Sequence, residues 1–175
     1  PYAQRLEQLQ LPQQHIRRIP ETFTAQAFIT TDLDDNQITA FHPGAMNFSH
    51  ENHVTRELGA SLAIIAPDGK QGMLQHAREC AAHGVPFLFD PGQGMPMFSR
   101  DELLEMVHLA DYLAVNDYEG KLLEEKTGQP LEALARELKG LIVTLGAKGS
   151  LILTDHARHE IPCVGAEAVL DPTGC

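Results

Sequence analysis

The sequence predicts an α/β fold in which a mostly parallel sheet is sandwiched by helices, with a small β-sheet lid beside it. Two patterns carry this prediction. From Leu58 onward, short apolar runs alternate with segments of helical periodicity, an order typical of parallel sheets. Upstream, two segments rich in Thr, Ile and Phe flank the turn-forming "LDDN", which favours a β-hairpin. We therefore assign residues 14–47 to the lid, and residues 1–13 and 48–175 to the α/β core.

Local signals predict the elements in order. Residues 2–9 suit a helix, because Leu6 and Leu9 fall on one face. The apolar runs "SLAIIAP", "VPFLFDP" and "DYLAVND" predict strands buried on both faces. Three more strands are expected in "LIVTLGAKGSLILTD", which contains a glycine turn, and in "HEIPCV". Helices are expected in "DGKQGMLQHARECAAHG" ending at Gly84, in "SRDELLEMVHLA" with a Ser99–Glu102 capping box, in "DYEGKLLEEKTG" ending at Gly128, and in "PLEALARELKG".

Composition limits the function. The 175 residues carry a net charge of −11, which argues against binding to nucleic acid or to anionic membranes, because both need clustered Lys and Arg. No apolar run reaches the ~20 residues that span a bilayer. The three cysteines have no CxxC spacing, which disfavours a zinc site and fits a cytoplasmic location. The chain begins without Met, inside a helical pattern, so we interpret it as an internal fragment of a longer protein.

Ligands in such sheets bind at the carboxyl ends of the strands, and a polar or glycine-rich loop follows each of the five apolar runs "LAIIA", "PFLF", "DYLAV", "LIVT" and "EAVL". Asp90 and Asp171 each follow an apolar run, although Asp is equally typical of turns and caps. In "NDYE", Asn116 and Glu119 have the spacing of a capping box. Both polar groups would also stand at a helix N-terminus, where phosphates and their Mg²⁺ ions bind.

Two further loops contain glycine. The turn "TLGAKG" has two glycines and a lysine but matches neither glycine-rich nucleotide motif, so a plain β-turn is the alternative to a phosphate site. The run "DPTG" is a turn of the kind that enters a helix, where backbone N–H groups favour an anion. This last loop suits the charge that develops on a phosphoryl group during its transfer.

Four segments, "PGAMN", "DYLAVNDYEGKLL", "VTLGAKGS" and "DPTGC", occur together and in this order. In this combination the chain resembles the ribokinase-like (PfkB) carbohydrate and nucleoside kinases over most of its length. The segment "TTDLDDNQITAFHPGAM" resembles more narrowly the lid of bacterial adenosine kinases and broad nucleoside kinases. The family's N-terminal strand, its substrate-binding Asp, its Gly-Gly segment and the C-terminal part of its adenine pocket are not in this sequence.

The resemblance implies an ATP-dependent kinase that transfers the γ-phosphoryl group to a sugar hydroxyl, most closely the 5′-OH of a purine nucleoside such as adenosine. A sugar kinase of the same family, acting on ribose or fructose, is the first alternative. A non-catalytic nucleoside- or nucleotide-binding homologue is the second. ATP and Mg²⁺ are the expected cofactors. Activation by K⁺, and pairing of two copies through the exposed lid edge, stay open.

The family's site residues map onto this chain by motif. Asn116 and Glu119 match the element that organises phosphate and Mg²⁺, with Glu119 reaching the metal through water. Phe41 would stack on the purine with help from Phe28, or else serve lid packing, and Gln93 would reach the substrate or phosphate edge. The ATP-binding loop is matched by Thr144, Gly146, Lys148 and Gly149, and the anion hole by Thr173, Gly174 and Cys175, with the catalytic Asp two residues after Cys175.

Overall fold

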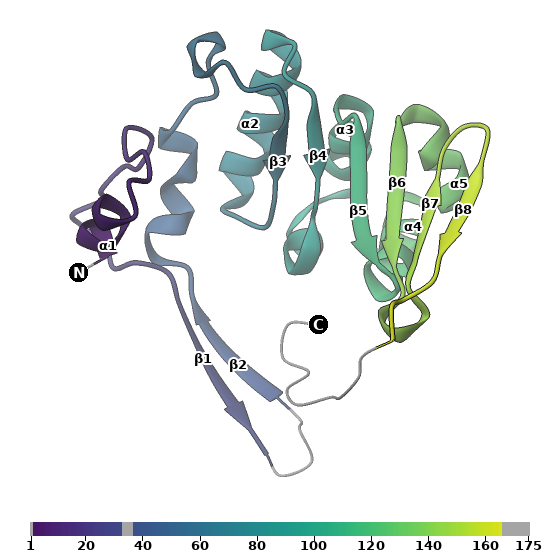
Figure 1. Ribbon diagram of the computed structural model, residues 1–175, viewed down its shortest axis with the longest axis horizontal. Helices are drawn as coiled ribbons and strands as arrows, with labels where there is room; N and C mark the ends of the chain where they lie inside the picture. Colours follow the sequence, from purple (N-terminus) through teal and green to yellow (C-terminus); the bar gives the residue numbers. More distant parts are fainter. Residues whose placement is uncertain (1, 33–36, 166–175) are drawn as a thin grey trace.

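The computed structural model describes residues 2–32 and 37–165 of the chain. They form a projecting two-stranded hairpin and a six-stranded sheet of order β3-β4-β5-β6-β7-β8 (Figure 1). The hairpin contains β1 (Gln26–Thr31) and β2 (Gln37–His42). The large sheet contains β3 (Ala63–Ile65), β4 (Phe87–Phe89), β5 (Tyr112–Asn116), β6 (Gly140–Thr144), β7 (Ser150–Leu153) and β8 (Arg158–Ile161).

Strands β3 to β6 are parallel. Three main helices connect them in chain order, α2 (Lys70–His83), α3 (Arg100–Leu109) and α4 (Asp117–Thr127). Crossovers between parallel strands are right-handed, so connections that always step to the next strand put their helices on the same face, which Figure 1 shows behind the sheet. β7 and β8 add antiparallel strands. The prediction of a mostly parallel α/β sheet with a small separate β-sheet is confirmed.

Burial alternates along β4, β5 and β7, because within the described residues the helices cover one face of the sheet. In β3, Ile65 is buried whereas Ile64 is 67% exposed. The expectation that this strand is buried on both faces is therefore wrong within the described part of the chain. The core lies between the sheet and the helices, and its fully buried large side chains include Phe87, Phe89, Met73, Met95, Met106, Leu103, Leu113, Leu123 and Leu141.

The ends of the main helices follow the signals read from the sequence. Gly84 and Gly128 adopt left-handed φ angles of 68° and 69° directly after α2 and α4, a conformation that glycine adopts without steric cost. At the start of α3, Ser99 and Glu102 form the expected capping box, in which each side chain accepts the backbone N–H of the other. These local preferences and the global fold therefore agree.

One helix is shorter than predicted. After Pro130, only α5 (Leu131–Leu134) is α-helical, and a 3₁₀ turn over Ala135–Glu137 follows. The reason is that the chain has to enter β6 beside β5 shortly afterwards. The backbone N–H of Lys139 donates to Asp111 O at 2.8 Å. The side-chain Nζ of Lys139 lies 2.6 Å from Asp111 Oδ1. This anchor leaves no room for a longer helix.

The lid region precedes the six-stranded sheet in the sequence. The helix α1 (Tyr2–Gln8) agrees with the helix predicted near the N-terminus, and every residue of β1 and β2 is exposed. After β2, a 3₁₀ helix over Gly44–Glu51 packs against α2; we call residues 43–54 the lid connector. None of the helices within residues 2–32 and 37–165 has the length and apolar character needed to cross a membrane.

The lid connector packs so closely on α2 that a glycine is needed inside the helix. A Cβ built on Gly72 overlaps Ser49 Oγ and lies 2.9 Å from Ser49 Cβ. At Gly120 in α4, the nearest atom to a built Cβ is the terminal methyl of Leu131 at 3.1 Å. The Leu131 methyl is the end of a flexible side chain and can shift. The Cβ of Ser49 is fixed to a backbone that packs against α2, so it cannot move away as easily.

We expect Gly72→Ala to destabilise the full-length protein by about 1 to 2 kcal/mol, because overpacking outweighs the gain in helix propensity. Urea unfolding measures this free energy. Gly120→Ala is the matched helical control and is expected to stay within about 0.5 kcal/mol of the wild type. Stabilisation by Gly72→Ala would contradict the close packing described above.

Candidate active site

A pocket opens at the carboxyl ends of the parallel strands. The register sets Asn116, the last residue of β5, opposite Thr144, the last residue of β6, and Asp90 directly follows β4. Because these strands run in the same direction, residues far apart in the sequence meet at one edge. The pocket is lined by Pro67, Asp90, Gly92, Gln93, Ala114, Val115, Asn116, Glu119 and Thr144.

Asn116 and Glu119 form a complete capping box at the start of α4. Asn116 Oδ1 accepts the backbone N–H of Glu119 at 2.8 Å, and Glu119 Oε2 accepts the backbone N–H of Asn116 at 2.8 Å. The helix-capping interpretation of this motif is therefore confirmed. The same two side chains line the pocket, so capping holds them in fixed orientations at the helix N-terminus, where the dipole favours negative charge.

Asp90 is a pocket residue that the sequence singled out only as the polar residue after a strand. Burial raises the pKa of its carboxyl above the ordinary value, and the nearby charge of Glu119 raises it further, while the backbone N–H of Gly92 partly offsets both. A carboxylate with a raised pKa beside a second carboxylate is typical of functional sites. The signal in the sequence that identifies Asp90 as a candidate is its position directly after the apolar run "PFLF".

The pocket has the donors of an open Mg²⁺ site. Asp90 and Glu119 supply two carboxylates, and no group of three or more His, Cys, Asp or Glu side chains able to hold a metal occurs within residues 2–32 and 37–165. Mg²⁺ typically binds through one or two carboxylates and completes its shell with water and substrate phosphates. The two carboxylates therefore fit an ion that keeps part of its water shell, and they are too few to enclose a metal with protein ligands alone.

The glycine turn follows β6 at the same edge of the sheet. Gly146 and Gly149 have positive φ angles of 58° and 92°, and a Cβ built on Gly149 overlaps Ile161 O, so the backbone itself requires glycine there. Leu145 N–H donates to Gly149 O at 2.8 Å and closes the turn. The exposed Lys148 stands within it. The turn is therefore a tight connection between β6 and β7 that carries an exposed lysine.

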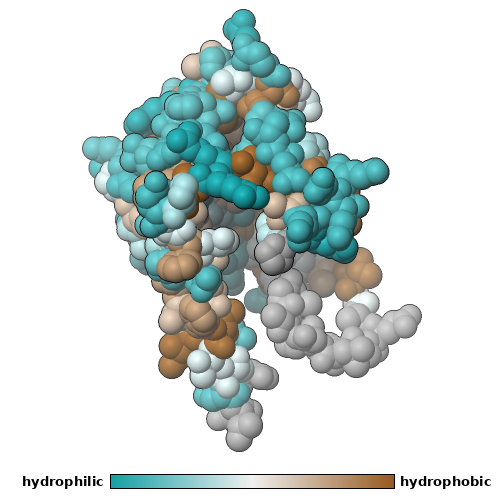
Figure 2. Space-filling view, turned by 90° about the vertical axis from the view of Figure 1, so that its left-hand side faces the viewer, coloured by the Kyte–Doolittle hydropathy of each residue, from teal (hydrophilic) through white to brown (hydrophobic). Residues whose placement is uncertain are grey.

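The lid places its two candidate phenylalanines on opposite faces. In an antiparallel pair, directly opposed residues share a face and successive residues alternate. Phe28 pairs with Ala40, whereas Phe41 pairs with Ala27. Their side chains are 61% and 54% exposed, and Figure 2 shows hydrophobic surface on the projecting hairpin. A single base held against one face would contact only one of the two rings.

Part of the predicted site cannot be placed. Asp171 and the anion-hole residues Thr173, Gly174 and Cys175 lie outside the described residues. Within them, the fold brings Gln93, Asn116, Glu119 and Thr144 together in one pocket. The glycine turn follows at the same edge, and the lid rings stand on a separate hairpin. Carboxylates, a capped helix N-terminus and a glycine turn at the carboxyl edge of an α/β sheet are features typical of sites for phosphate-bearing ligands.

The family follows from comparison with known proteins. The sequence profile described as pfkB family carbohydrate kinase matches residues 1–175, and the chain therefore belongs to that family. It is 34% identical over 154 residues to a nucleoside kinase of Methanocaldococcus jannaschii, which covers 88% of this chain and 50% of the relative. It is 29% identical over 166 residues to a ribokinase of Lactococcus lactis, which covers 92% of this chain and 52% of the relative.

Solved structures show the ribokinase-like fold. The nucleoside kinase of Burkholderia thailandensis in complex with inosine is 51% identical, with a TM-score of 0.93, over 100% of this chain and 57% of that chain. The same enzyme in complex with ADP-inosine superposes with a TM-score of 0.91 over 100% of this chain and 55% of that chain. This chain thus spans little more than half the length of the relatives it matches.

We expect Asp90→Asn to stabilise the full-length protein at neutral pH when no metal is bound. The folded-state pKa of Asp90 is raised above 3.8, so ionisation costs more in the folded than in the unfolded state. This cost is absent below the ordinary pKa, grows as the pH rises, and is complete above the raised pKa. Urea unfolding in EDTA from pH 3 to pH 8 should show a gain for the variant that disappears at the acid end.

Proposed function

We propose that the full-length protein is an ATP-dependent nucleoside kinase that transfers the γ-phosphoryl group to the 5′-OH of a purine nucleoside such as adenosine. The observation that carries this proposal is the pocket at the carboxyl edge, which gathers Asp90, Asn116, Glu119 and Thr144. The chain that forms it is 51% identical to a nucleoside kinase solved with inosine and with ADP-inosine. A cytoplasmic location is part of the proposal, and the two cysteines within residues 2–32 and 37–165, Cys80 and Cys163, are free as that location requires.

The residues divide into groups with different tasks. Glu119, fixed by its cap, would hold Mg²⁺ through water, and Asp90 would supply the second carboxylate. Bound there, Mg²⁺ would neutralise charge on the phosphates. The ATP phosphates and nucleotide would lie along Thr144, Gly146, Lys148 and Gly149, with Gln93 at the substrate or phosphate edge. Thr173, Gly174 and Cys175 would donate backbone N–H groups to the transferred phosphoryl group, and an Asp two residues after Cys175 would accept the proton of the 5′-OH.

The lid supports a purine substrate and a second copy of the protein as partner. Phe28 shares its face of the hairpin with Ile38, and Phe41 shares the other face with Ile29, as the register requires. Both faces therefore carry exposed apolar side chains. One face can close over a flat base, where an aromatic ring buries a large area. The other is then left to pair with the lid of a second protomer.

We expect the full-length protein to phosphorylate adenosine or inosine with a kcat/KM on the order of 100-fold or more above that for ribose or fructose. A free sugar lacks the base, and with it the apolar area that contributes binding energy. A coupled ATP-consumption assay with the four acceptors measures the ratio. Preference for a free sugar would favour the alternative that the ribokinase relative supports. Nucleoside binding without turnover would identify a non-catalytic homologue.

Glu119→Gln separates the metal role from the capping role. The amide oxygen of Gln can still accept the N–H of Asn116, so stability should stay within about 0.5 kcal/mol of the wild type. Loss of the charge should lower kcat about 10- to 100-fold and raise the Mg²⁺ concentration required. Both are read from initial rates at varied Mg²⁺ and from thermal unfolding.

The capping box of α3 offers the matched control. Glu102 accepts the backbone N–H of Ser99 at 2.7 Å, but Glu102 does not line the pocket. Its carboxyl also pairs with Lys70 at 2.8 Å, which with the cap lowers its pKa to about 2. Glu102→Gln should therefore lower stability more than activity. A wild-type kcat in Glu119→Gln would contradict the metal role and would mean that Glu119 only caps α4.

A further inference from the structure

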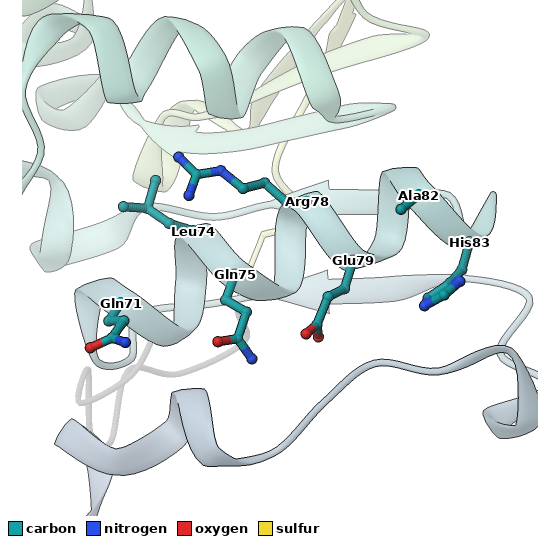
Figure 3. A pocket seen from close by; sticks show the side chains of 7 residues that line it. All are labelled: Gln71, Leu74, Gln75, Arg78, Glu79, Ala82 and His83. Atoms are coloured by element: carbon teal, nitrogen blue, oxygen red, sulfur yellow. The ribbon is translucent and has the colours of Figure 1, made fainter.

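One face of α2 holds the lid connector through a group of polar side chains. Glu79 Oε2 accepts the backbone N–H of Val54 at 2.7 Å, and Glu79 Oε1 lies 2.7 Å from His53 Nδ1. Gln75 Nε2 donates to His50 O at 2.9 Å and to Asn52 O at 3.2 Å. In Figure 3, Gln75 and Glu79 point to the side of α2 where the connector runs, whereas Arg78 points to the opposite side.

The chain that enters the hairpin is tied to the same connector. Arg17 Nη2 lies 2.6 Å from Glu51 Oε2, and Asn52 Nδ2 donates to His15 O at 3.3 Å. At the base of the hairpin, Ala45 N–H donates to Phe23 O at 2.9 Å. Both segments that lead to β1 and from β2 therefore end on the connector, and the connector is fastened to α2.

The bonds from α2 are the stronger part of this attachment. A backbone N–H bound to a carboxylate is a charge-assisted hydrogen bond, about twice as strong as a neutral one. Burial alone raises the pKa of Glu79, but the bonds from His53 and Val54 outweigh it, so the pKa lies below its ordinary value and the carboxylate stays charged. The carboxylate of Glu51 is more exposed than that of Glu79, and surface ion pairs such as Arg17–Glu51 contribute little.

We propose that Gln75 and Glu79 are positioning residues that set the placement of the lid over the nucleoside. Within residues 2–32 and 37–165 every residue of β1 and β2 is exposed, and the hydrogen bonds at the base tie the hairpin to the core through α2. The effect on substrate rests on the proposed nucleoside kinase activity; the effect on the lid itself does not. If the attachment loosens, a smaller fraction of molecules has the lid in the productive place, and apparent affinity falls by that fraction.

Kinetics of the full-length protein test the effect on substrate. We expect Glu79→Ala and Gln75→Ala to raise the KM for nucleoside about 3- to 10-fold, while the KM for ATP changes less than about twofold. Glu79→Gln keeps an acceptor for Val54 N–H and should recover most of the loss. The control is Arg78→Gln, at the position directly before Glu79 in α2. The guanidinium of Arg78 donates to Glu105 of α3 at 2.7 and 2.8 Å and does not reach the connector. This substitution should leave both KM values unchanged.

Hydrogen–deuterium exchange without substrate tests the attachment independently of any activity. Amides of residues 22–31 and 37–46 should exchange faster in Glu79→Ala than in the wild type, and Arg78→Gln should not show this change. Equal changes in both variants, in exchange or in KM, would mean general destabilisation and would overturn the proposal. So would faster exchange of the lid with an unchanged nucleoside KM. Absence of any nucleoside phosphorylation by the wild type would refute the kinase assignment, while the exchange comparison would still decide the attachment.

Discussion

The structure depends on one constraint, the parallel hydrogen-bonded alignment of β3 to β6 in consecutive order. This alignment brings the carboxyl ends of these four strands to the same edge. Phe89 lies opposite Leu113 and Asn116 opposite Thr144, so the residues that follow β4 and those that end β5 and β6 meet without being neighbours in sequence. The helices on one face, the open pocket and the glycine turn all take their places from this ladder of backbone bonds.

Much of this arrangement could be predicted from the sequence because local chemistry and fold agree. Apolar runs alternate with helical periodicity only where a strand is followed by a crossover helix. Gly84 and Gly128 end their helices for a backbone reason that holds in any context. The spacing of Asn116 and Glu119 implies reciprocal hydrogen bonds that form within a single helical turn. Signals of this kind need no knowledge of distant parts of the chain.

Other features depend on tertiary neighbours that one sequence does not reveal. The 3₁₀ turn after Leu134 is imposed by Asp111, which anchors the backbone of Lys139. The separation of Phe28 and Phe41 depends on the register of the hairpin, and a shift of one residue would reverse it. The pKa of Asp90 is raised by its burial in the folded chain and further by the charge of Glu119. In each case the structure depends on a residue that is distant in the sequence or on the register of two strands, and the sequence alone specifies neither.

If the hairpin turns about its base as one rigid piece, it acts as a lever. Each of its strands has six residues. Such a strand is about 20 Å long, so a rotation of about 10° at the base displaces the far end by about 3 Å. A change of a few tenths of an ångström among the hydrogen bonds on α2 is thereby magnified at the distal end of β1 and β2. Gln75 and Glu79, which face the lid connector and do not line the pocket at the carboxyl edge, would thus affect the position of the far end of the hairpin.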